Sequence, residues 1–193
     1  MLLSVKIIAQ NEQYTKNYFG TLGSRRIKTL RNTNLKPTPE KLREKIFSWL
    51  MSDINDARCL DLFAGSGSLG IEAISNGADF CTFVEQNPNL YKNLKENIST
   101  LSLEEKTKLH RTRAEDFVRR FKDAPFDIIF FDPPYKRDYY NNFFEIFLSK
   151  LCKKGSIIYV EQSVHDKVLE NDSLQNLKNS KIGEAQGSLF IKK

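Results

Sequence analysis

The chain has 193 residues, of which 40% are hydrophobic and 28% charged, and it carries a formal net charge of +6. This length suits one domain with a full core, and the composition is that of an ordinary soluble protein. A membrane-spanning helix needs about 18 consecutive apolar residues, and no apolar run in the sequence approaches that length. The first residues lack the basic and apolar regions of a signal peptide. A membrane protein is therefore excluded, and a cytoplasmic one is expected.

The positive charge is concentrated near the N-terminus. Residues 1–50 contain ten Lys or Arg and three Asp or Glu, whereas residues 51–193 contain twenty and twenty-one. Charge alone leaves two interpretations open, a solvated basic face and a surface that contacts phosphate groups. The candidate phosphate contacts are Arg25, Arg26, Lys28, Arg31 and Arg43.

The first well-marked element is a helix within "KPTPEKLREKIFSWL", residues 36–50. Thr38 is placed to cap this helix, and Pro39 suits its first position. An apolar stripe on the helix predicts packing against a core and consists of Leu42, Ile46, Trp49 and Leu50. Further upstream, residues 3–9 and 18–30 are typical of strands or an extended arm. We assign residues 1–36 to a basic N-terminal arm or hairpin and residues 37–193 to the main domain.

From residue 57 onward, strand patterns and helix patterns alternate. The predicted strands are 57–63, 80–85, 108–111, 127–131 and 156–161, with a possible C-terminal hairpin of 176–182 and 187–191. The predicted helices are 68–76, 88–99, 115–121 and 139–151. This alternation predicts a doubly wound, mainly parallel α/β sheet. Ligands of such sheets bind at the carboxyl ends of the central strands.

The cysteines and histidines give no sign of a metal centre. Cys59, Cys81 and Cys152 are far apart in the sequence, and two of them lie in apolar strand-like runs, so buried reduced thiols are expected. The chain has no C-x-x-C pair, and its only histidines are His110 and His165. We therefore expect no bound metal.

A glycine-rich loop follows the first predicted strand of the sheet, in "DLFAGSGSLG", residues 61–70. Its glycines allow a tight turn and a close approach of backbone N–H groups to a ligand, although G-x-G-x-x-G alone is weak evidence. A second acid, Glu85, ends the next predicted strand and could accept hydrogen bonds from both hydroxyls of a ribose. The glycine-rich loop and Glu85 together favour a nucleoside-binding site over a plain strand-to-helix turn.

The sequence "IIFFDPPY", residues 128–135, combines a buried strand with a rigid turn. An amino nitrogen conjugated to a ring is a poor nucleophile, and acceptors for its N–H groups would direct its lone pair. Asp132 can supply one acceptor and the backbone carbonyl of Pro133 the other, while Tyr135 can stack on the base. Hydride transfer has no obvious need for such a turn. The pattern therefore favours transfer of a methyl group from S-adenosylmethionine to an amino group over a nicotinamide-dependent reaction.

In this order, "PTPEKLREKIFSWL", "LDLFAGSGSLGIEAISNGA", "FVEQNPN" and "FDPPY" resemble the RsmD-type bacterial small-subunit rRNA guanine-N2 methyltransferases. The resemblance implies a Rossmann-like class I methyltransferase fold with a seven-strand, mainly parallel sheet, and S-adenosyl-L-methionine as the methyl donor. It also implies a monomer that methylates the N2 amino group of one guanine in 16S rRNA, free or in an assembling small subunit.

The resemblance also implies roles for individual residues. Those expected to line the donor site are Asp61, Phe63, Gly65, Gly67, Glu85, Gln86, Ala114, Glu115 and Asp132. The residues expected at the target amine are Asp132, Pro133, Pro134 and Tyr135. The basic residues named above would then contact RNA.

The chain departs from the family pattern near its start. A family stretch of the form "GGxxRGRxL" appears here as "FGTLGSRRIKTL", and residues 1–17 do not match. Two alternative functions stay open: amino-methylation of DNA adenine or cytosine or of a protein glutamine, and a nicotinamide-dependent or catalytically silent nucleotide-binding module.

Overall fold

The computed structural model describes residues 12–16, 20–30, 38–134, 139 and 142–193. The strand expected at 3–9 lies outside these ranges. The helices are α2 (Glu40–Leu50), α3 (Ser68–Ser75), α4 (Pro88–Thr100), α5 (Ala114–Arg120) and α6 (Asn142–Leu151), with a 3-10 turn at Glu104–Lys106. The strands are β1 (Glu12–Lys16), β2 (Arg26–Leu30), β3 (Arg58–Asp61), β4 (Phe80–Val84), β5 (Thr107–His110), β6 (Phe126–Phe131), β7 (Cys152–Ser163), β8 (Leu174–Ile182) and β9 (Ala185–Lys192).

Seven strands form the central sheet, in the order β5-β4-β3-β6-β7-β9-β8. Strands β3 to β7 run parallel to one another, and β9 is antiparallel to both β7 and β8. The predicted mainly parallel sheet with a C-terminal hairpin is therefore confirmed. The chain order reverses at β3, which has β4 on one side and β6 on the other, so the switch point of the sheet lies between β3 and β6.

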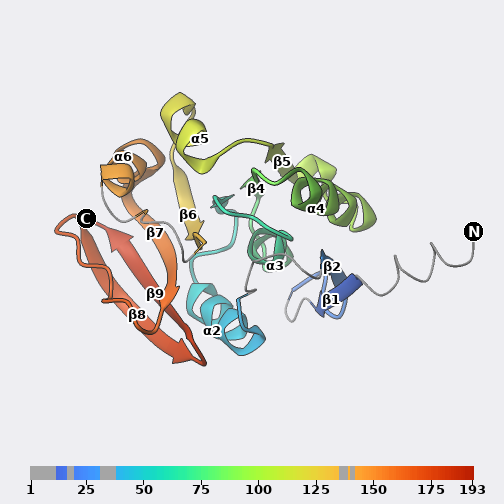
Figure 1. Cartoon of the computed structure of the whole chain (residues 1–193), viewed down its shortest axis with the longest axis horizontal. Helices are drawn as coiled ribbons and strands as arrows, with labels where there is room; N and C mark the ends of the chain where they lie inside the picture. The colour runs from blue at the N-terminus through green and yellow to red at the C-terminus, as the bar shows by residue number, and fades with distance from the viewer. Residues whose placement is uncertain (1–11, 17–19, 31–37, 135–138, 140–141) are drawn as a thin grey trace, which may run out of the picture.

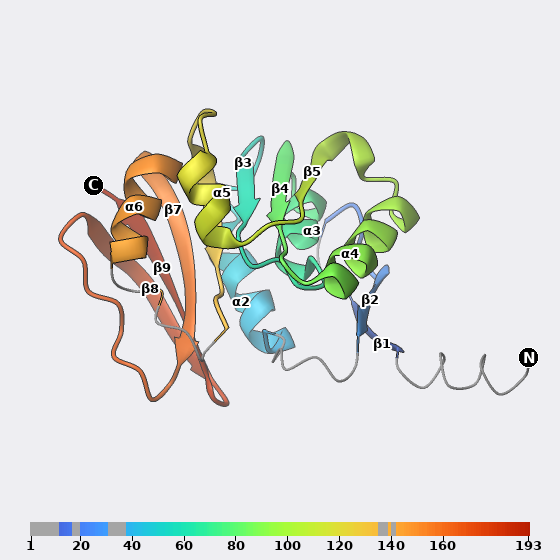
Figure 2. The ribbon, with the colours of Figure 1, turned by 45° about the horizontal axis from the view of Figure 1, so that its top comes forward.

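Helices cover both faces of the sheet. Helices α2, α3 and α4 lie on one face, and α5 and α6 lie on the other (Figure 1, Figure 2). A hydrophobic core lies on each face of the sheet, and alternate side chains of β6 contribute to each. Ile128 and Phe130 pack on the first face, and Ile129 and Phe131 pack on the second. Burial on both faces explains why this strand is a continuous apolar run.

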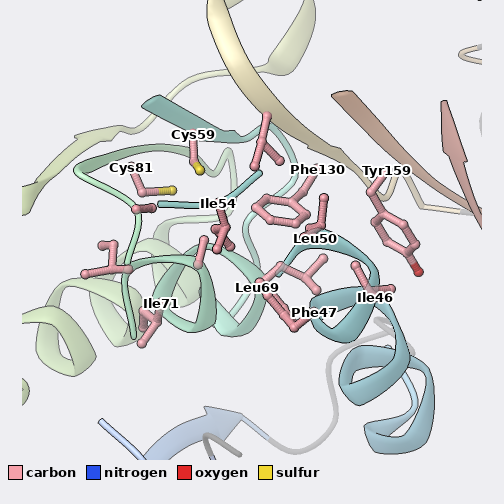
Figure 3. Packing of buried hydrophobic residues seen from close by; sticks show 14 of the residues in the cluster. Ile46, Phe47, Leu50, Ile54, Cys59, Leu69, Ile71, Cys81, Phe130 and Tyr159 are labelled. Carbon is pink, nitrogen blue, oxygen red and sulfur yellow. The ribbon is translucent and has the colours of Figure 1, made fainter. Parts of the chain in front are cut away.

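The first core fixes α2 against the sheet. Figure 3 shows Ile46, Phe47 and Leu50 of α2 pointing toward Phe130 and Tyr159. The ring centroids of Phe47 and Phe130 are 5.8 Å apart. Because these side chains are almost fully buried, the start of α2 is held in a defined place beside the sheet.

The N-terminal hairpin, formed by β1 and β2, packs on the domain that follows it. The backbone N–H of Lys28 donates to Asn97 Oδ1 at 3.0 Å, and its carbonyl accepts from the side-chain amides of Asn93 and Asn97. The N–H of Thr21 donates to the Ser75 carbonyl at 2.9 Å, and Ile27 is fully buried. The described part of the predicted arm therefore shares the core of α3 and α4.

The start of α2 differs from the sequence prediction. Thr38 does not cap the helix: Pro39 is the N-cap, with φ of −55° and ψ of 137°, and no side chain caps α2. The Thr38 hydroxyl instead donates to Oδ2 of Asp132, at 3.3 Å. The residue before a proline favours extended conformations, which an N-cap residue also adopts, so the hydrogen bond to Asp132 and not the backbone preference distinguishes the observed contact from the predicted one.

The three cysteines are buried and unpaired, as expected. Burial raises the pKa of Cys152 to about 12. Within the described part of the chain, no helix is both long and apolar enough to cross a bilayer.

Candidate active site

Three carboxylates gather at the carboxyl ends of the central strands. Asp61 is the last residue of β3, Glu85 follows β4, and Asp132 follows β6. Since β4, β3 and β6 are parallel neighbours, the ends of these strands lie along one edge of the sheet. The structure thus brings these three predicted site residues together at the switch point, where ligands of doubly wound sheets bind.

The glycine loop joins β3 to α3 in a tight turn. Gly67 precedes α3 with φ of 84°, a conformation that favours glycine. A Cβ on Gly67 would lie 2.3 Å from Leu94 Cδ1, and one on Gly70 would lie 2.3 Å from the Phe83 ring. These glycines therefore let the loop and α3 approach β4 and α4 closely.

Asp61 is buried beneath this loop. Its Oδ2 accepts a hydrogen bond from the N–H of Gly70 at 3.1 Å. Burial raises the pKa of Asp61 to about 7, with a further rise from Glu85, although the Gly70 N–H favours the ionised form. Asp61 thus ties α3 to the end of β3 through the N–H of Gly70.

Glu85 is held by backbone groups on two sides. Its Oε2 accepts from the N–H of Gly65 at 2.9 Å, and its Oε1 accepts from the N–H of Asn87 at 2.7 Å. Burial raises the pKa of Glu85, and the N–H groups of Asn87, Gly65 and Gln86 oppose that rise. A carboxylate offers about four lone-pair positions, so Glu85 can also accept from ligand hydroxyls. Gln86 itself is exposed.

The start of α5 and an aromatic cluster contain the other predicted donor-site residues. Ala114 is buried at the first position of α5, and Glu115 forms an ion pair with Arg113 at 3.0 Å. Phe63 packs edge-on against Phe131 and Tyr139, with centroid distances of 5.3 and 5.0 Å. The hydrogen bond with Glu115 raises the pKa of Arg113, and Tyr139 contributes a smaller rise. Ala114 belongs to the same buried cluster as Phe131 and Tyr139, so the start of α5 lies near these aromatic side chains.

Asp132 lies near two other acids, Glu161 and Asp61. Burial raises the pKa of its carboxyl well above the usual range, and Glu161 and Asp61 raise it further. The hydroxyl of Thr38 favours the ionised form. Pro133 is buried and Pro134 half-buried, while Tyr135 lies outside the described residues. The rigid turn after β6 thus carries a carboxylate with an unusually high affinity for a proton.

The predicted phosphate contacts fall into two groups. Arg25 and Arg26 are exposed on the N-terminal hairpin, and Lys28 is partly exposed with its Nζ 3.7 Å from Oε2 of Glu96. Arg31 lies outside the described residues.

Arg43 does not belong with these surface residues, and the prediction that it contacts phosphates is wrong. Its side chain is 2% exposed, and its Nε lies 3.9 Å from Oε2 of Glu72, which is 1% exposed. Arg43 shares a face of α2 with the buried Ile46, Phe47 and Leu50, three, four and seven positions later. Helical spacing could have placed Arg43 inside.

Sequence reasoning missed two residues next to Asp132, Thr38 and Glu161. Glu161 is 1% exposed near the end of β7, and its Oε2 accepts from the Tyr159 hydroxyl at 2.8 Å. A signal was available, because Glu161 ends the strand predicted at 156–161. The rule that carboxyl ends of parallel strands share an edge places it beside Asp132.

The family model described as conserved hypothetical protein 95 matches residues 16–191. A protein of Buchnera aphidicola subsp. Acyrthosiphon pisum named ribosomal RNA small subunit methyltransferase D is 36% identical over 173 residues, covering 89% of this chain and 90% of the relative. A Haemophilus influenzae protein of the same name is 34% identical over 178 residues, with the same coverages. The solved structure of yhhF from Escherichia coli has a TM-score of 0.84 at 26% identity, covering 94% of this chain and 99% of that one.

Proposed function

The chain belongs to the conserved hypothetical protein 95 family, the RsmD-type methyltransferases that its motifs resemble, and we propose that it methylates the N2 amino group of a guanine in 16S rRNA. The fold is that of a class I methyltransferase. The observation that supports the amino-group specificity is Asp132 in its rigid turn, adjacent to the glycine loop across the β3–β6 switch point.

The charge of the site fits S-adenosylmethionine as the methyl donor. Among the described residues, the ionisable groups that raise the pKa values of Asp61 and Asp132 are acids, namely Glu85 for Asp61, and Glu161 and Asp61 for Asp132. An acidic site favours a cationic sulfonium with an ammonium group and disfavours the phosphates of a nicotinamide dinucleotide. Glu85 would hold the ribose, and the bound donor supplies an electrophilic methyl group.

The turn after β6 would act on the amine. The N–H groups of the guanine amine donate to Asp132 and to the Pro133 carbonyl, which directs the nitrogen lone pair toward the methyl carbon. With the two atoms held in line at about 3–3.5 Å, the nitrogen–carbon bond would form as the carbon–sulfur bond breaks. S-adenosylhomocysteine would then leave, and the nitrogen would release one N–H proton to solvent.

The proposed function is tested by transfer of a labelled methyl group. Purified protein is given labelled donor with naked rRNA, small ribosomal subunits, assembling particles or DNA, and the products are digested to nucleosides. We expect label in N2-methylguanosine from small-subunit rRNA. Label in methyladenine or methylcytosine of DNA would support the DNA methyltransferase alternative instead, and no transfer to any nucleic acid would refute the proposal.

Glu85→Ala is expected to weaken binding of S-adenosylhomocysteine by roughly tenfold or more. A hydrogen bond to a charged group contributes about 1.5–3 kcal/mol, and the substitution also frees the N–H groups of Gly65 and Asn87. Isothermal calorimetry measures the affinity. Glu105→Ala, at an exposed glutamate of the 3-10 turn Glu104–Lys106, is the matched control, and equal affinities in the Glu85 variant and the wild type would remove Glu85 from the donor site.

The double variant Arg25→Ala/Arg26→Ala is expected to weaken RNA binding and to reduce its salt dependence. Removing one cation that neutralises a phosphate lowers the slope of log K against log salt by about 1, so the slope should fall by about 2. Arg119→Ala/Arg120→Ala removes two exposed arginines from α5, across the sheet, and is the charge-matched control. Donor affinity should be unchanged in both. If the two double variants had the same slope, the hairpin would be a solvated basic face.

A further inference from the structure

The proposed chemistry depends on the protonation state of the Asp132 carboxyl group. This group must accept a hydrogen bond from the target amine, and an ionised carboxylate is the better acceptor. Burial and the charges of Glu161 on β7 and Asp61 on β3 all favour its protonated form. Some contact has to favour the anion and to fix which oxygen faces the substrate.

The described residues offer one such contact, the hydroxyl of Thr38. Its Oγ1 donates to Asp132 Oδ2 at 3.3 Å, across 94 positions of the sequence. This distance is long for a hydroxyl–carboxylate hydrogen bond, but active-site hydrogen bonds often shorten when the substrate binds. The contact occupies Oδ2, and no hydrogen bond from the described residues reaches Oδ1, the oxygen that would accept from an incoming N–H group.

Both partners of this contact are held rigidly. Thr38 precedes Pro39 and Asp132 precedes Pro133, so proline confines each of them to extended backbone conformations. Thr38 is 7% exposed, and α2, which begins two residues later, is fixed by the fully buried Leu42 and Ile46. The hydroxyl is therefore aimed at Asp132 by the backbone and the core.

The side chain of Glu161, the acid next to Asp132, is also held in place. Glu161 accepts a hydrogen bond from the Tyr159 hydroxyl at 2.8 Å. A Cβ on Gly187 would lie 2.8 Å from that hydroxyl, so glycine leaves space for the ring. Within the described residues, no group of three or more potential ligands is arranged to hold a metal ion, so these acids are not explained as a cation site.

We propose that Thr38 is a positioning residue for the methyl transfer, whose hydroxyl holds Oδ2 of Asp132 and presents Oδ1 to the target amine. This role rests on the proposed function.

The test compares Thr38→Val, which has a similar shape and no hydroxyl, with Thr38→Ser, which keeps the hydroxyl. Single-turnover methyl transfer to small-subunit rRNA is measured across pH, together with the affinities for S-adenosylhomocysteine and for RNA. We expect Thr38→Val to react about tenfold more slowly at neutral pH, with its acid limb displaced to higher pH. Thr38→Ser should remain close to the wild type, and both binding affinities should be unchanged.

A second measurement does not depend on the substrate. Carbon-13 titration of the aspartate carboxyls, with Asp132 assigned by its loss in Asp132→Asn, reports the pKa of Asp132 directly. Loss of a hydrogen bond to the anion should raise that pKa in Thr38→Val and leave it unchanged in Thr38→Ser.

Two outcomes would overturn the inference. In one, Thr38→Val matches the wild type in both rate and titration. In the other, Thr38→Ser is as slow as Thr38→Val without a change in the Asp132 titration, which would assign the effect to packing of the methyl group. A wild-type protein inactive on rRNA would refute the proposed function, and the titration would still decide whether Thr38 governs Asp132.

Discussion

Asp132→Ala is expected to slow single-turnover methyl transfer by about 100- to 10,000-fold, the range typical of a missing group that acts on the reacting proton or its bond. The carboxylate contacts the amine and not the sulfonium, so binding of S-adenosylhomocysteine should change little. The variant also removes an acid that burial and Glu161 hold in a costly position, so it should fold at least as well as the wild type. A large loss of rate without loss of stability would therefore be specific to catalysis.

Asp132→Asn is the matched variant, since its amide oxygen still accepts one N–H hydrogen bond. It should retain more activity than Asp132→Ala, and its rate should lose the pH dependence that comes from Asp132. The sign follows from the raised pKa of the wild-type carboxyl: transfer is slow at low pH, where Asp132 is protonated, and rises as pH passes that pKa. Full activity in Asp132→Ala would refute the amine mechanism itself.

The fold and the place of the site could be predicted because both depend on local patterns. Alternating apolar strands and amphipathic helices specify a doubly wound sheet, and acids at the ends of β3, β4 and β6 must then share its carboxyl edge. The roles of Asp61, Glu85 and Asp132 in binding and catalysis stay predictions. So does stacking by Tyr135, which lies outside the described residues.

What the sequence did not reveal depends on contacts between distant segments. Thr38 has the residue type and position of a helix cap, and only the folded chain shows its hydroxyl at Asp132. Arg43 has the charge of an RNA contact, and only the packing of α2 against α3 gives it a buried partner. In both cases the predicted role is a common one for that residue type, but a contact with a distant part of the chain gives the side chain a different partner.

Arg43→Ala is accordingly expected to destabilise the protein by about 3–5 kcal/mol, since it removes a buried side chain and one of the interactions that compensate the buried charge of Glu72. For a chain of this size, each kcal/mol lowers the melting temperature by about 2–4 °C, so the transition should fall by roughly 10 °C. Urea unfolding monitored by circular dichroism measures the free energy. Arg26→Ala, on the exposed face of the N-terminal hairpin, should change stability by less than about 0.5 kcal/mol.

The double variant Arg43→Met/Glu72→Leu separates the charge from the packing. A buried ion pair can often be replaced by apolar side chains of similar volume at little cost, because desolvation offsets most of the attraction between the charges. The double variant should therefore recover most of the stability that Arg43→Ala removes. If Arg43→Ala instead kept wild-type stability and bound RNA more weakly with a shallower salt dependence, Arg43 would contact phosphates after all, and its burial between α2 and α3 would not describe the protein in solution.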